Sequence, residues 1–587
     1  MIMAVNGKSK KIDYSNWSQT ELIKEIKKLE KRKKYGIIWD EERTKEVFEE
    51  QVQEKLPVLK DVTKNGIEDS SKPNNILIEG DNYHALSVLN YTHKRKVDVI
   101  YIDPPYNIGK EFRYNDKLVD LEDSYRHSKW LSFMSKRLRL AKKLLKHTGI
   151  IFISINDNEV AQLRILCDEI FGDKNFISCI VNVNNPKGRS DDKYIARAHE
   201  YVLVYKKKDA MVFGWSLNEK ILKRYNKLDK NRKKYREIDL RKTGDNDRKE
   251  DRLNLFYFFL YNEKTGDFYA TRDEKIPKNY LQIIPIKENG DLGNWRWELD
   301  NANLNKKYLI PKLMPTRKIW SVFEKDYLDP QRKIKPTSAW TDTWSNSERG
   351  SKQFIELGFD KSDFLNPKPI GLIKKICEYS LDKNGIILDF FAGSGTTGHA
   401  ILDLNKEDGG NRKFILCTNN ENNICTDVCY PRLKKVIKGY KNSKNEKIEG
   451  LGGNLKYFKT SFVDSELTDQ NKKNLVEQST EMLCIKEDCF ELIKEGKQFK
   501  IFKNHNDKYL GIIYFYEGIK PLKKEILKLN KKINTYVFSL TDEIDVEEFI
   551  EVDQLVTLKP IPSAILNVYR RIFAYVQIKK LPRKTRK

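Results

Sequence analysis

Short, uninterrupted runs of apolar residues recur in two widely separated parts of the chain. The runs occupy residues 75–82, 97–102, 149–158 and 198–205, and then 386–388 and 413–421. Runs of this length without regular polar alternation are typical of strands buried on both faces of a parallel sheet. Residues 370–381 predict a helix just before the second group. The pattern therefore predicts an α/β core that is assembled from two segments of the chain.

An amphipathic helix is predicted near the amino terminus. Ser18-Gln19-Thr20-Glu21 has the form of a capping box, in which the first and last side chains accept from each other's backbone N–H groups. Leu22, Ile23, Ile26 and Leu29 follow at helical spacing. The helix is expected over residues 18–34, with a basic outer face.

The residues that follow the run at 97–102 have the chemistry of a binding loop. Asp103-Pro104-Pro105-Tyr106 leaves the carboxyl end of the predicted strand, which is the edge where open α/β sheets bind ligands. The prolines have fixed φ and no N–H, so the loop is stiff and its carbonyls are available as acceptors. Asp103 adds a carboxylate and Tyr106 adds a flat ring. This combination suits a planar amine, such as the exocyclic amino group of a nucleobase.

A glycine-rich motif, Asp389-Phe390-Phe391-Ala392-Gly393-Ser394-Gly395, follows the run at 386–388. Glycines allow a sharp turn and a close approach of the backbone to a ligand. Residues 393–398 also fit the G-x-G-x-x-G pattern of dinucleotide sites and nearly fit a phosphate-binding loop. His399 stands where that loop needs a lysine, so binding of a nucleoside triphosphate is disfavoured.

The two motifs together resemble those of the amino-group DNA methyltransferases that use S-adenosylmethionine. In that family the glycine motif surrounds the methionine part of the donor, and the Asp-Pro-Pro-Tyr motif binds the target amine. The catalytic motif comes first in this chain, as in the circularly permuted β group of the family. The resemblance implies a Rossmann-like α/β methyltransferase core. It assigns catalysis to Asp103, Pro104, Pro105 and Tyr106.

The resemblance also implies a set of donor-binding residues. Asp81 is expected near the donor's adenine, and residues 364–369 resemble the motif that flanks the donor pocket. Glu421 is the candidate for the ribose hydroxyls. Asn419 and Asn420 are its substitutes, because residues 405–412 look like an inserted loop that lengthens the spacing. The full set is Asp81, Asn82, Lys368, Pro369, Asp389, Phe390, Phe391, Gly393, Gly395, Thr396, Thr397 and Glu421.

The segment between the two halves of the core has a different composition. Residues 220–242 contain eleven Lys or Arg against three acids, in a chain whose formal net charge is +25. Aromatic elements follow, at residues 256–259, in a predicted hairpin over 261–269, and at residues 295–297. Basic side chains neutralise phosphates, and neighbouring side chains can reach base edges. The segment is predicted to be the target-recognition domain, with most of its aromatic rings in its own core.

The overall layout resembles that of the modification subunit of type III restriction–modification systems. The predicted domains are a helical arm (1–65), the catalytic part of the core (66–205), the target-recognition domain (206–354), the donor-binding part of the core (355–445) and an additional α+β domain with a basic tail (446–587). In the last domain, residues 483–502 and 509–515 suggest strands, and residues 521–531 and 562–576 suggest helices. The resemblance implies double-stranded DNA as substrate, a homodimer and a separate restriction subunit with helicase and nuclease activity.

Several classes of protein are disfavoured by the sequence. It contains no run of about 18 apolar residues, and residues 1–13 lack the apolar region of a secretory signal, so a bacterial cytoplasmic protein is expected. The eight cysteines are expected to be reduced. Cys417, Cys425 and Cys429 do not have the spacing of a zinc site, and the expected chemistry needs no metal.

Alternatives to this interpretation remain open. Asp103 at the first position of the tetrapeptide favours adenine N6, by a tendency of the family, over cytosine N4. A solitary regulatory methyltransferase would have the same motifs. A nicotinamide-dinucleotide oxidoreductase would explain the glycine pattern but neither Asp-Pro-Pro-Tyr nor the basic insertion. A DNA-binding scaffold without activity would not need both motifs intact.

Overall fold

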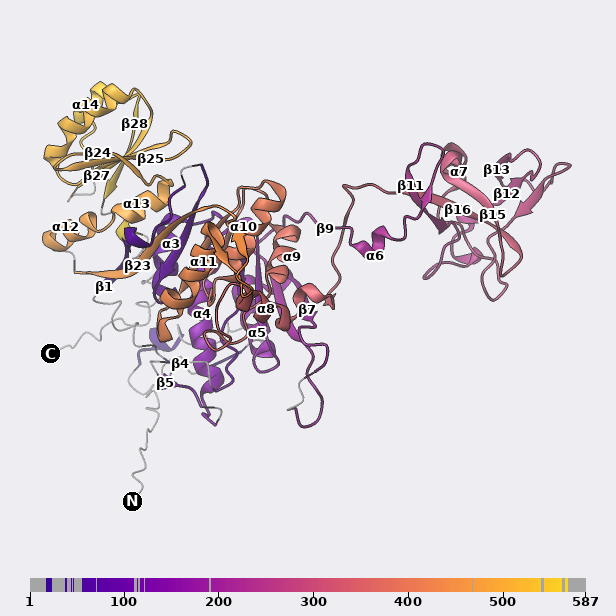
Figure 1. Cartoon of the computed structure of the whole chain (residues 1–587), viewed down its shortest axis with the longest axis horizontal. Helices are drawn as coiled ribbons and strands as arrows, with labels where there is room; N and C mark the ends of the chain where they lie inside the picture. Colours follow the sequence, from indigo (N-terminus) through magenta and orange to yellow (C-terminus); the bar gives the residue numbers. More distant parts are fainter. Residues whose placement is uncertain are drawn as a thin grey trace, which may run out of the picture. The chain divides into compact units, whose positions relative to one another are not determined.

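The computed structural model describes residues 17–23, 37–39, 44, 46, 55–69, 71–109, 113–114, 117–120, 122–188, 192–466, 468–539, 543–561 and 565–567. They form two compact units. Unit 1 contains the described residues up to Phe213 and from Thr337 onward, and unit 2 contains Gly214–Pro336. Unit 2 is therefore an insertion in the sequence of unit 1 (Figure 1).

A ten-stranded sheet forms the centre of unit 1. Its order is β1 (Lys55–Asp61), β23 (Asn454–Asp464), β2 (Asn74–Glu79), β20 (Lys413–Thr418), β19 (Ile386–Asp389), β3 (Val97–Ile102), β6 (Leu145–Ile155), β8 (Glu200–Lys206), β7 (Phe176–Asn182) and β18 (Ala339–Trp340). Neighbouring strands from β23 to β6 are parallel, and β8 is antiparallel to both β6 and β7. The two halves of the sequence interleave, because β20 and β19 lie between β2 and β3. The predicted α/β fold class is confirmed.

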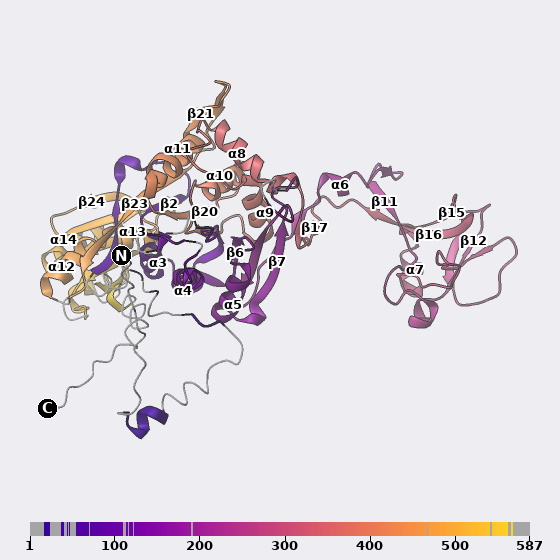
Figure 2. The ribbon, with the colours of Figure 1, turned by 90° about the horizontal axis from the view of Figure 1, so that it is seen from below.

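Helices cover both faces of this sheet (Figure 2). One face carries α3 (Asn82–Thr92), α4 (Arg126–Leu144) and α5 (Val160–Phe171), and the other carries α9 (Ile370–Ser380), α10 (Thr396–Asp408) and α11 (Tyr430–Lys438). Because both faces are covered, a central strand such as β2 is buried at every position. No helix among the described residues has the length and apolar character that a bilayer span requires.

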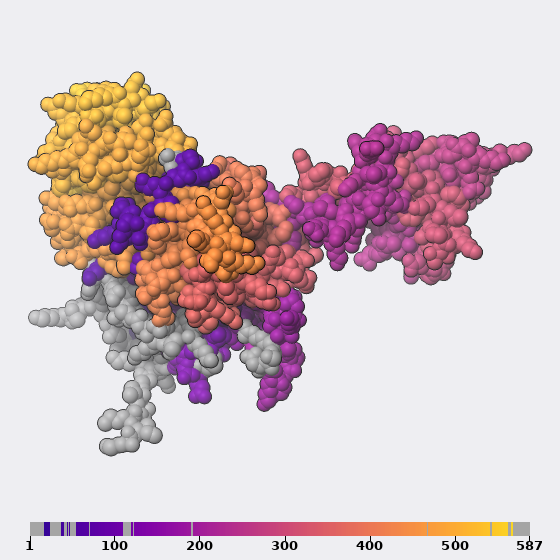
Figure 3. Space-filling model, viewed as in Figure 1, coloured from indigo at the N-terminus to yellow at the C-terminus, as the bar shows by residue number. Residues whose placement is uncertain are grey.

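The carboxyl-terminal part of unit 1 carries a second sheet. Helices α12 (Asp469–Glu477) and α13 (Thr480–Glu487) precede five strands, with α14 (Ile519–Leu529) packed against them. The strand order is β24 (Glu491–Glu495), β25 (Phe499–Lys503), β26 (Tyr509–Ile513), β27 (Ile533–Phe538) and β28 (Val556–Ile561). Helix α13 contacts α3 and β1, and in Figure 3 the indigo residues lie against this orange and yellow part.

Unit 2 is built from small antiparallel sheets. One has the order β10 (Lys227–Leu228), β11 (Lys234–Asp239), β16 (Ile319–Tyr327) and β15 (Leu309–Met314), and another has β13 (Phe268–Thr271), β12 (Phe258–Tyr261) and β14 (Leu281–Ile283). The predicted hairpin is the β12–β13 pair. Tyr257, Phe259 and Trp295 are buried in the core of the unit, as expected for most of these rings.

Two local predictions were wrong. Residues 483–487 were expected in a strand but belong to α13, whose apolar residues pack into the core beneath the second sheet. Residues 405–412 were expected in a loop, but α10 continues to Asp408 and only a short turn follows. That turn is closed by Arg412, whose guanidinium donates to Asp408 at 2.9 and 3.0 Å, so its polar residues mark a helix end.

The predicted amino-terminal helix is described only at its start. Ser18 and Glu21 form the expected capping box, with each backbone N–H donating to the other residue's side chain at 2.9 and 3.3 Å. Residues 24–34 lie outside the described residues, as do most of residues 562–576, for which another helix was predicted.

Candidate active site

Two strand ends from opposite halves of the sequence meet in the centre of the sheet of unit 1. β19 pairs with β3 in parallel, with Leu388 opposite Ile100, so their carboxyl ends lie side by side. Asp389 ends the first strand, and Asp103 follows the second. The sheet continues to β20 on one side of this pair and to β6 on the other. The junction is therefore the switch point where open α/β sheets bind ligands.

The glycine motif forms a tight turn that is fixed by Asp389. One carboxylate oxygen of Asp389 accepts from the backbone N–H of Phe391 at 3.0 Å, and the other accepts from the hydroxyl of Thr397 at 2.6 Å. Gly393 and Gly395 have φ values of +50° and +77°, in the left-handed region that favours glycine. Burial raises the pKa of Asp389 to about 7, against the effect of these two hydrogen bonds. Asp389 therefore stabilises the turn through these hydrogen bonds.

An arginine that the sequence analysis did not identify supports the same turn. Arg432 of α11 is fully buried and donates to the hydroxyls of Ser394 at 3.0 Å and Thr396 at 2.8 Å. Burial lowers its pKa to about 10. An arginine in a helix carries no local signal of such a role, because its partners lie in a distant segment.

Replacing Gly393 with valine is expected to weaken binding of the methyl donor by about tenfold or more. A β-branched residue at this φ is strained, and a Cβ would lie 2.9 Å from the ring of Phe364. Titration calorimetry with S-adenosylmethionine measures the effect, and Gly409→Ala is a matched control. Gly409 also has a positive φ, but no atom lies within 4 Å of its Cβ position. Equal affinities of both variants would contradict a donor site at the turn.

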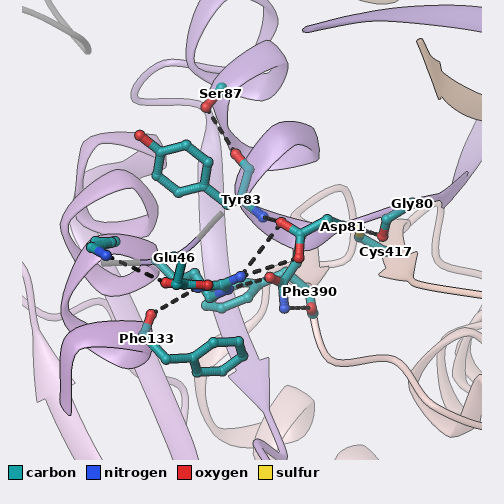
Figure 4. Close-up of polar contacts among 11 residues, drawn as sticks. Glu46, Gly80, Asp81, Tyr83, Ser87, Phe133, Phe390 and Cys417 are labelled. Carbon is teal, nitrogen blue, oxygen red and sulfur yellow. Dashed lines mark hydrogen bonds and ion pairs between the residues drawn. The ribbon is translucent and has the colours of Figure 1, made fainter. Parts of the chain in front are cut away.

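Asp81 and Asn82 lie at the start of α3, where a buried arginine orders them. Asp81 accepts from the backbone N–H of Tyr83 at 2.7 Å as the helix cap, and Arg137 of α4 donates to it at 3.1 Å (Figure 4). Arg137 also donates to Asn82 and to both carboxylate oxygens of Glu46, at 3.1 and 3.2 Å. Burial is the largest single effect and tends to raise the pKa of Asp81, but Arg137, His84 and the backbone N–H of Tyr83 together outweigh it and keep the pKa below its ordinary value.

Asn82 connects this cluster to the glycine motif. Its amide donates to the backbone carbonyl of Phe390 at 3.0 Å. The ring of Phe390 is fully buried, whereas Phe391 is half-buried and its ring centre lies 5.8 Å from that of Phe133. Phe390 therefore contributes its backbone to the site, and of the two rings only that of Phe391 has exposed surface.

The Asp-Pro-Pro-Tyr loop is tied to the helices beneath it. Pro104 is buried, and the carbonyl of Pro105 accepts from the indole N–H of Trp130 at 2.8 Å. Asn107 has a φ of +56° and donates to Glu159 at 2.6 Å. Because Trp130 uses the carbonyl of Pro105, we expect the carbonyl of Pro104 to be the one that meets a target amine.

Four polar side chains meet beside this loop. The hydroxyl of Tyr106 lies 2.7 Å from Asp103 Oδ1 and 3.1 Å from Glu200 Oε2. The ammonium of Lys368 lies 2.8 Å from that hydroxyl, 2.7 Å from Glu200 and 3.3 Å from Asp103. Lys368 was predicted on the donor side but lies beside the catalytic tetrapeptide. Glu200 lies in the apolar run at residues 198–205, and its burial next to Asp103 could not be predicted from that run.

The remaining predicted donor-binding residues, Pro369 and Glu421, lie at the starts of two helical segments. Pro369 caps the start of α9. Glu421 follows β20 and is exposed, whereas Asn420 uses its side-chain carbonyl to accept from the backbone N–H of Thr426 at 3.0 Å. Of the three ribose candidates, Glu421 and Asn419 are exposed and are therefore better available than Asn420. Within the described parts of the chain, no group of three or more His, Cys, Asp or Glu side chains could bind a metal ion.

Comparison with known proteins finds one family whose match covers both the tetrapeptide and the glycine motif. A family described as DNA methylase matches residues 97–429. The type II methyltransferase M.KpnI of Klebsiella pneumoniae is 35% identical over 384 residues, which cover 63% of this chain and 89% of that protein.

Two further relatives are named as subunits of type III enzymes. The StyLTI Mod subunit of Salmonella typhimurium is 32% identical and the EcoPI Mod subunit of Escherichia phage P1 is 32% identical, each over 62% of this chain. This chain spans 55% and 61% of their respective lengths. Among solved structures, the M1.HpyAVI–SAM complex is 16% identical with a TM-score of 0.28, over 61% of this chain and 98% of that one.

Proposed function

This chain belongs to the DNA methylase family, and from that premise we propose that it transfers a methyl group from S-adenosylmethionine to the N6 amino group of adenine in double-stranded DNA. The observation that carries the proposal is the junction of β3 and β19. It brings a stiff loop that carries a carboxylate and an aromatic ring next to a tight glycine turn suited to binding the methyl donor. The metal-free chemistry of amine methylation fits these residues.

The residues at the turn fit an adenosyl donor. Gly393 and Gly395 leave room for close approach of a ligand, the partly exposed Asp81 offers acceptors, and the exposed Glu421 suits ribose hydroxyls. When bound, S-adenosylmethionine would supply an electrophilic methyl group.

The residues of the tetrapeptide would act on the other reactant. A base inside a duplex is out of reach, so it must be flipped out at a cost of about a few kcal/mol. Asp103 and the carbonyl of Pro104 would accept hydrogen bonds from its amino group, and Tyr106 would stack on its ring. This arrangement directs the nitrogen lone pair away from the ring, and the nitrogen loses a proton after it has gained the methyl group. Positioning and electrostatics would supply most of the rate.

The choice of adenine over cytosine is supported by Asp103, because aspartate at this position is more common in the adenine-specific members of the family. Unit 2 is proposed as the part that selects the DNA sequence. The basic stretch at residues 220–242 supports phosphate contacts, and the separate core of unit 2 allows sequence choice to vary without changing the catalytic sheet.

We further propose that the protein is the modification subunit of a type III system. The large insertion, the additional carboxyl-terminal sheet and the identity to two Mod subunits support this assignment. It implies a homodimer in the bacterial cytoplasm that binds a restriction subunit. The 35% identity to M.KpnI over 89% of that protein instead favours an enzyme that acts without such a subunit. A neighbouring reading frame with helicase and nuclease motifs would distinguish these two.

The test of the reaction is incubation of the purified protein with S-adenosylmethionine and unmethylated genomic DNA, followed by mass spectrometry of the digested nucleosides. N6-methyladenine is the expected product. N4-methylcytosine would keep the site but overturn the choice of base. Absence of both, with thermal stabilisation by NAD rather than by S-adenosylmethionine, would favour the dinucleotide alternative.

A further inference from the structure

A buried ion pair lies directly behind the proposed catalytic carboxylate. Lys368 and Glu200 contact each other at 2.7 Å, and their side chains are only 13% and 6% exposed. Each of them also contacts the hydroxyl of Tyr106, at 2.8 and 3.1 Å, and Lys368 lies 3.3 Å from Asp103. Glu200 is fixed from a neighbouring strand by the amide of Asn182, which donates to Glu200 Oε1 at 3.1 Å.

The hydroxyl of Tyr106 lies against the carboxylate that the target amine would need, and a second acceptor for that hydroxyl lies nearby. Asp103 must accept from the target amine, yet the hydroxyl of Tyr106 lies 2.7 Å from Asp103 Oδ1. A buried hydroxyl that loses its acceptor is costly unless another acceptor is in reach. Glu200 Oε2 is such an acceptor, at 3.1 Å from the same hydroxyl. The proton of Tyr106 can therefore turn from Asp103 to Glu200 when the amine arrives.

Lys368 has a different role from Glu200 in the same cluster. Two carboxylates this close would repel each other, and one of them would tend to take up a proton. The ammonium lies between them, within 3.3 Å of both. It compensates both charges, so Asp103 can remain an ionised acceptor next to Glu200.

We propose that Lys368 and Glu200 are positioning residues for methyl transfer, in which Lys368 keeps Asp103 ionised and Glu200 takes over the hydroxyl of Tyr106 when the target amine binds. The inference rests on the proposed function, which it deepens at the same site. Neither residue needs to touch the donor or the target base. Both act through Asp103 and Tyr106.

The groups that face Asp103 set the direction in which its pKa changes. These are Lys368, Glu200 on β8, Tyr106 in the loop, Tyr101 on β3 and Asp389 on β19. Burial raises the pKa of Asp103, Lys368 lowers it, and Glu200 raises it further. Loss of the ammonium should therefore raise the pKa of Asp103, whereas loss of the charge on Glu200 should lower it.

The test is the pH dependence of single-turnover methyl transfer, measured between about pH 5 and pH 9 with labelled S-adenosylmethionine and unmethylated genomic DNA. Transfer needs ionised Asp103, so the acidic limb of the profile reports its pKa. Lys368→Met is expected to move this limb to higher pH by about one unit or more, and Glu200→Gln to lower pH. Lys368→Arg keeps the charge and should leave the limb near its wild-type position.

A second pair of variants separates the exchange of hydrogen bonds from the effect of charge. Glu200→Gln still offers an acceptor to Tyr106, but Glu200→Ala does not. The plateau rate of the alanine variant is expected to be about tenfold or more below that of the glutamine variant. If a single variant folds poorly because one buried charge is left alone, the double variant Lys368→Met/Glu200→Gln removes both charges, and its limb should lie between those of the two single variants.

Lys374→Met is the control for loss of a lysine charge. Lys374 lies on α9 and pairs with Asp403 and Glu407 at 2.8 and 2.5 Å, away from the tetrapeptide, so the limb should not move. If Lys368→Met and Glu200→Gln shifted the acidic limb in the same direction, or if neither shifted it, the inference would be overturned. Methylation by the wild type would in that case still support the proposed function. A wild-type protein that methylates no DNA would overturn the proposed function itself.

Discussion

The Asp103→Ala variant is expected to transfer methyl groups about a thousandfold more slowly than the wild type, the scale on which loss of one preorganised polar group acts in a closed site. Asp103 is the proposed acceptor for the target amine and the partner of Tyr106 at 2.7 Å. The donor site uses other residues, which are ordered by Asp389 and Arg137. Affinity for S-adenosylmethionine should therefore change by no more than about threefold, which corresponds to about 0.7 kcal/mol.

Two measurements on the same protein sample check this prediction. Methyl transfer is followed by nucleoside mass spectrometry, and donor affinity is measured by titration calorimetry. Asp403→Ala is the control, because Asp403 lies on α10 and pairs with Lys374 outside the site. Activity of the Asp103→Ala protein equal to that of the control would remove Asp103 from the mechanism. Joint loss of transfer and of donor binding would instead indicate a collapsed site.

The sequence was sufficient to predict the parts of the site whose signal is local. Each predicted core strand forms, because an uninterrupted apolar run has few alternatives to burial in a covered sheet. The strand at residues 200–206, β8, differs from the others in being antiparallel to both of its neighbours. Asp103 and Asp389 follow two such runs, so their positions at the edge of the sheet could be predicted. Membership of the DNA methylase family, predicted from the two motifs and their order, is confirmed.

The parts that could not be predicted depend on contacts between distant segments. Glu200 lies beside Asp103 because β8 is antiparallel to β6, so the first residue of β8 lies at the edge where β3 and β6 end. No local pattern in residues 198–205 indicates this pairing. Lys368 was assigned to the donor side because its motif flanks the donor pocket in the family, yet its ammonium reaches the catalytic carboxylate. The roles of the buried arginines Arg137 and Arg432 could not be predicted for the same reason, because the fold brings their partners from distant segments.

The Arg137→Met variant is expected to lose about 3 kcal/mol of unfolding free energy, the lower end of the cost of removing one partner from a buried ion pair. The lower end applies because Lys136 lies 3.5 Å from Glu46 and compensates part of its charge. Asp81 is 41% exposed, so water can also replace part of what it loses, whereas Glu46 is only 8% exposed. Donor affinity should fall by about tenfold or more, because Asp81 and Asn82 lose the group that orders them.

The control for this variant lies two residues further along the same helix. Arg139 pairs with Glu169 at 3.1 Å, but both side chains are about one-third exposed, so Arg139→Met should cost well under about 1 kcal/mol. Adding Glu46→Gln to Arg137→Met removes the carboxylate that was left without its guanidinium, and stability should recover in part. Urea unfolding of the four proteins gives these free energies, and equal losses for Arg137→Met and Arg139→Met would contradict the buried network. If instead the double variant regains stability but not donor affinity, Arg137 acts on the donor through Asp81 and Asn82, independently of the amino-terminal contact with Glu46.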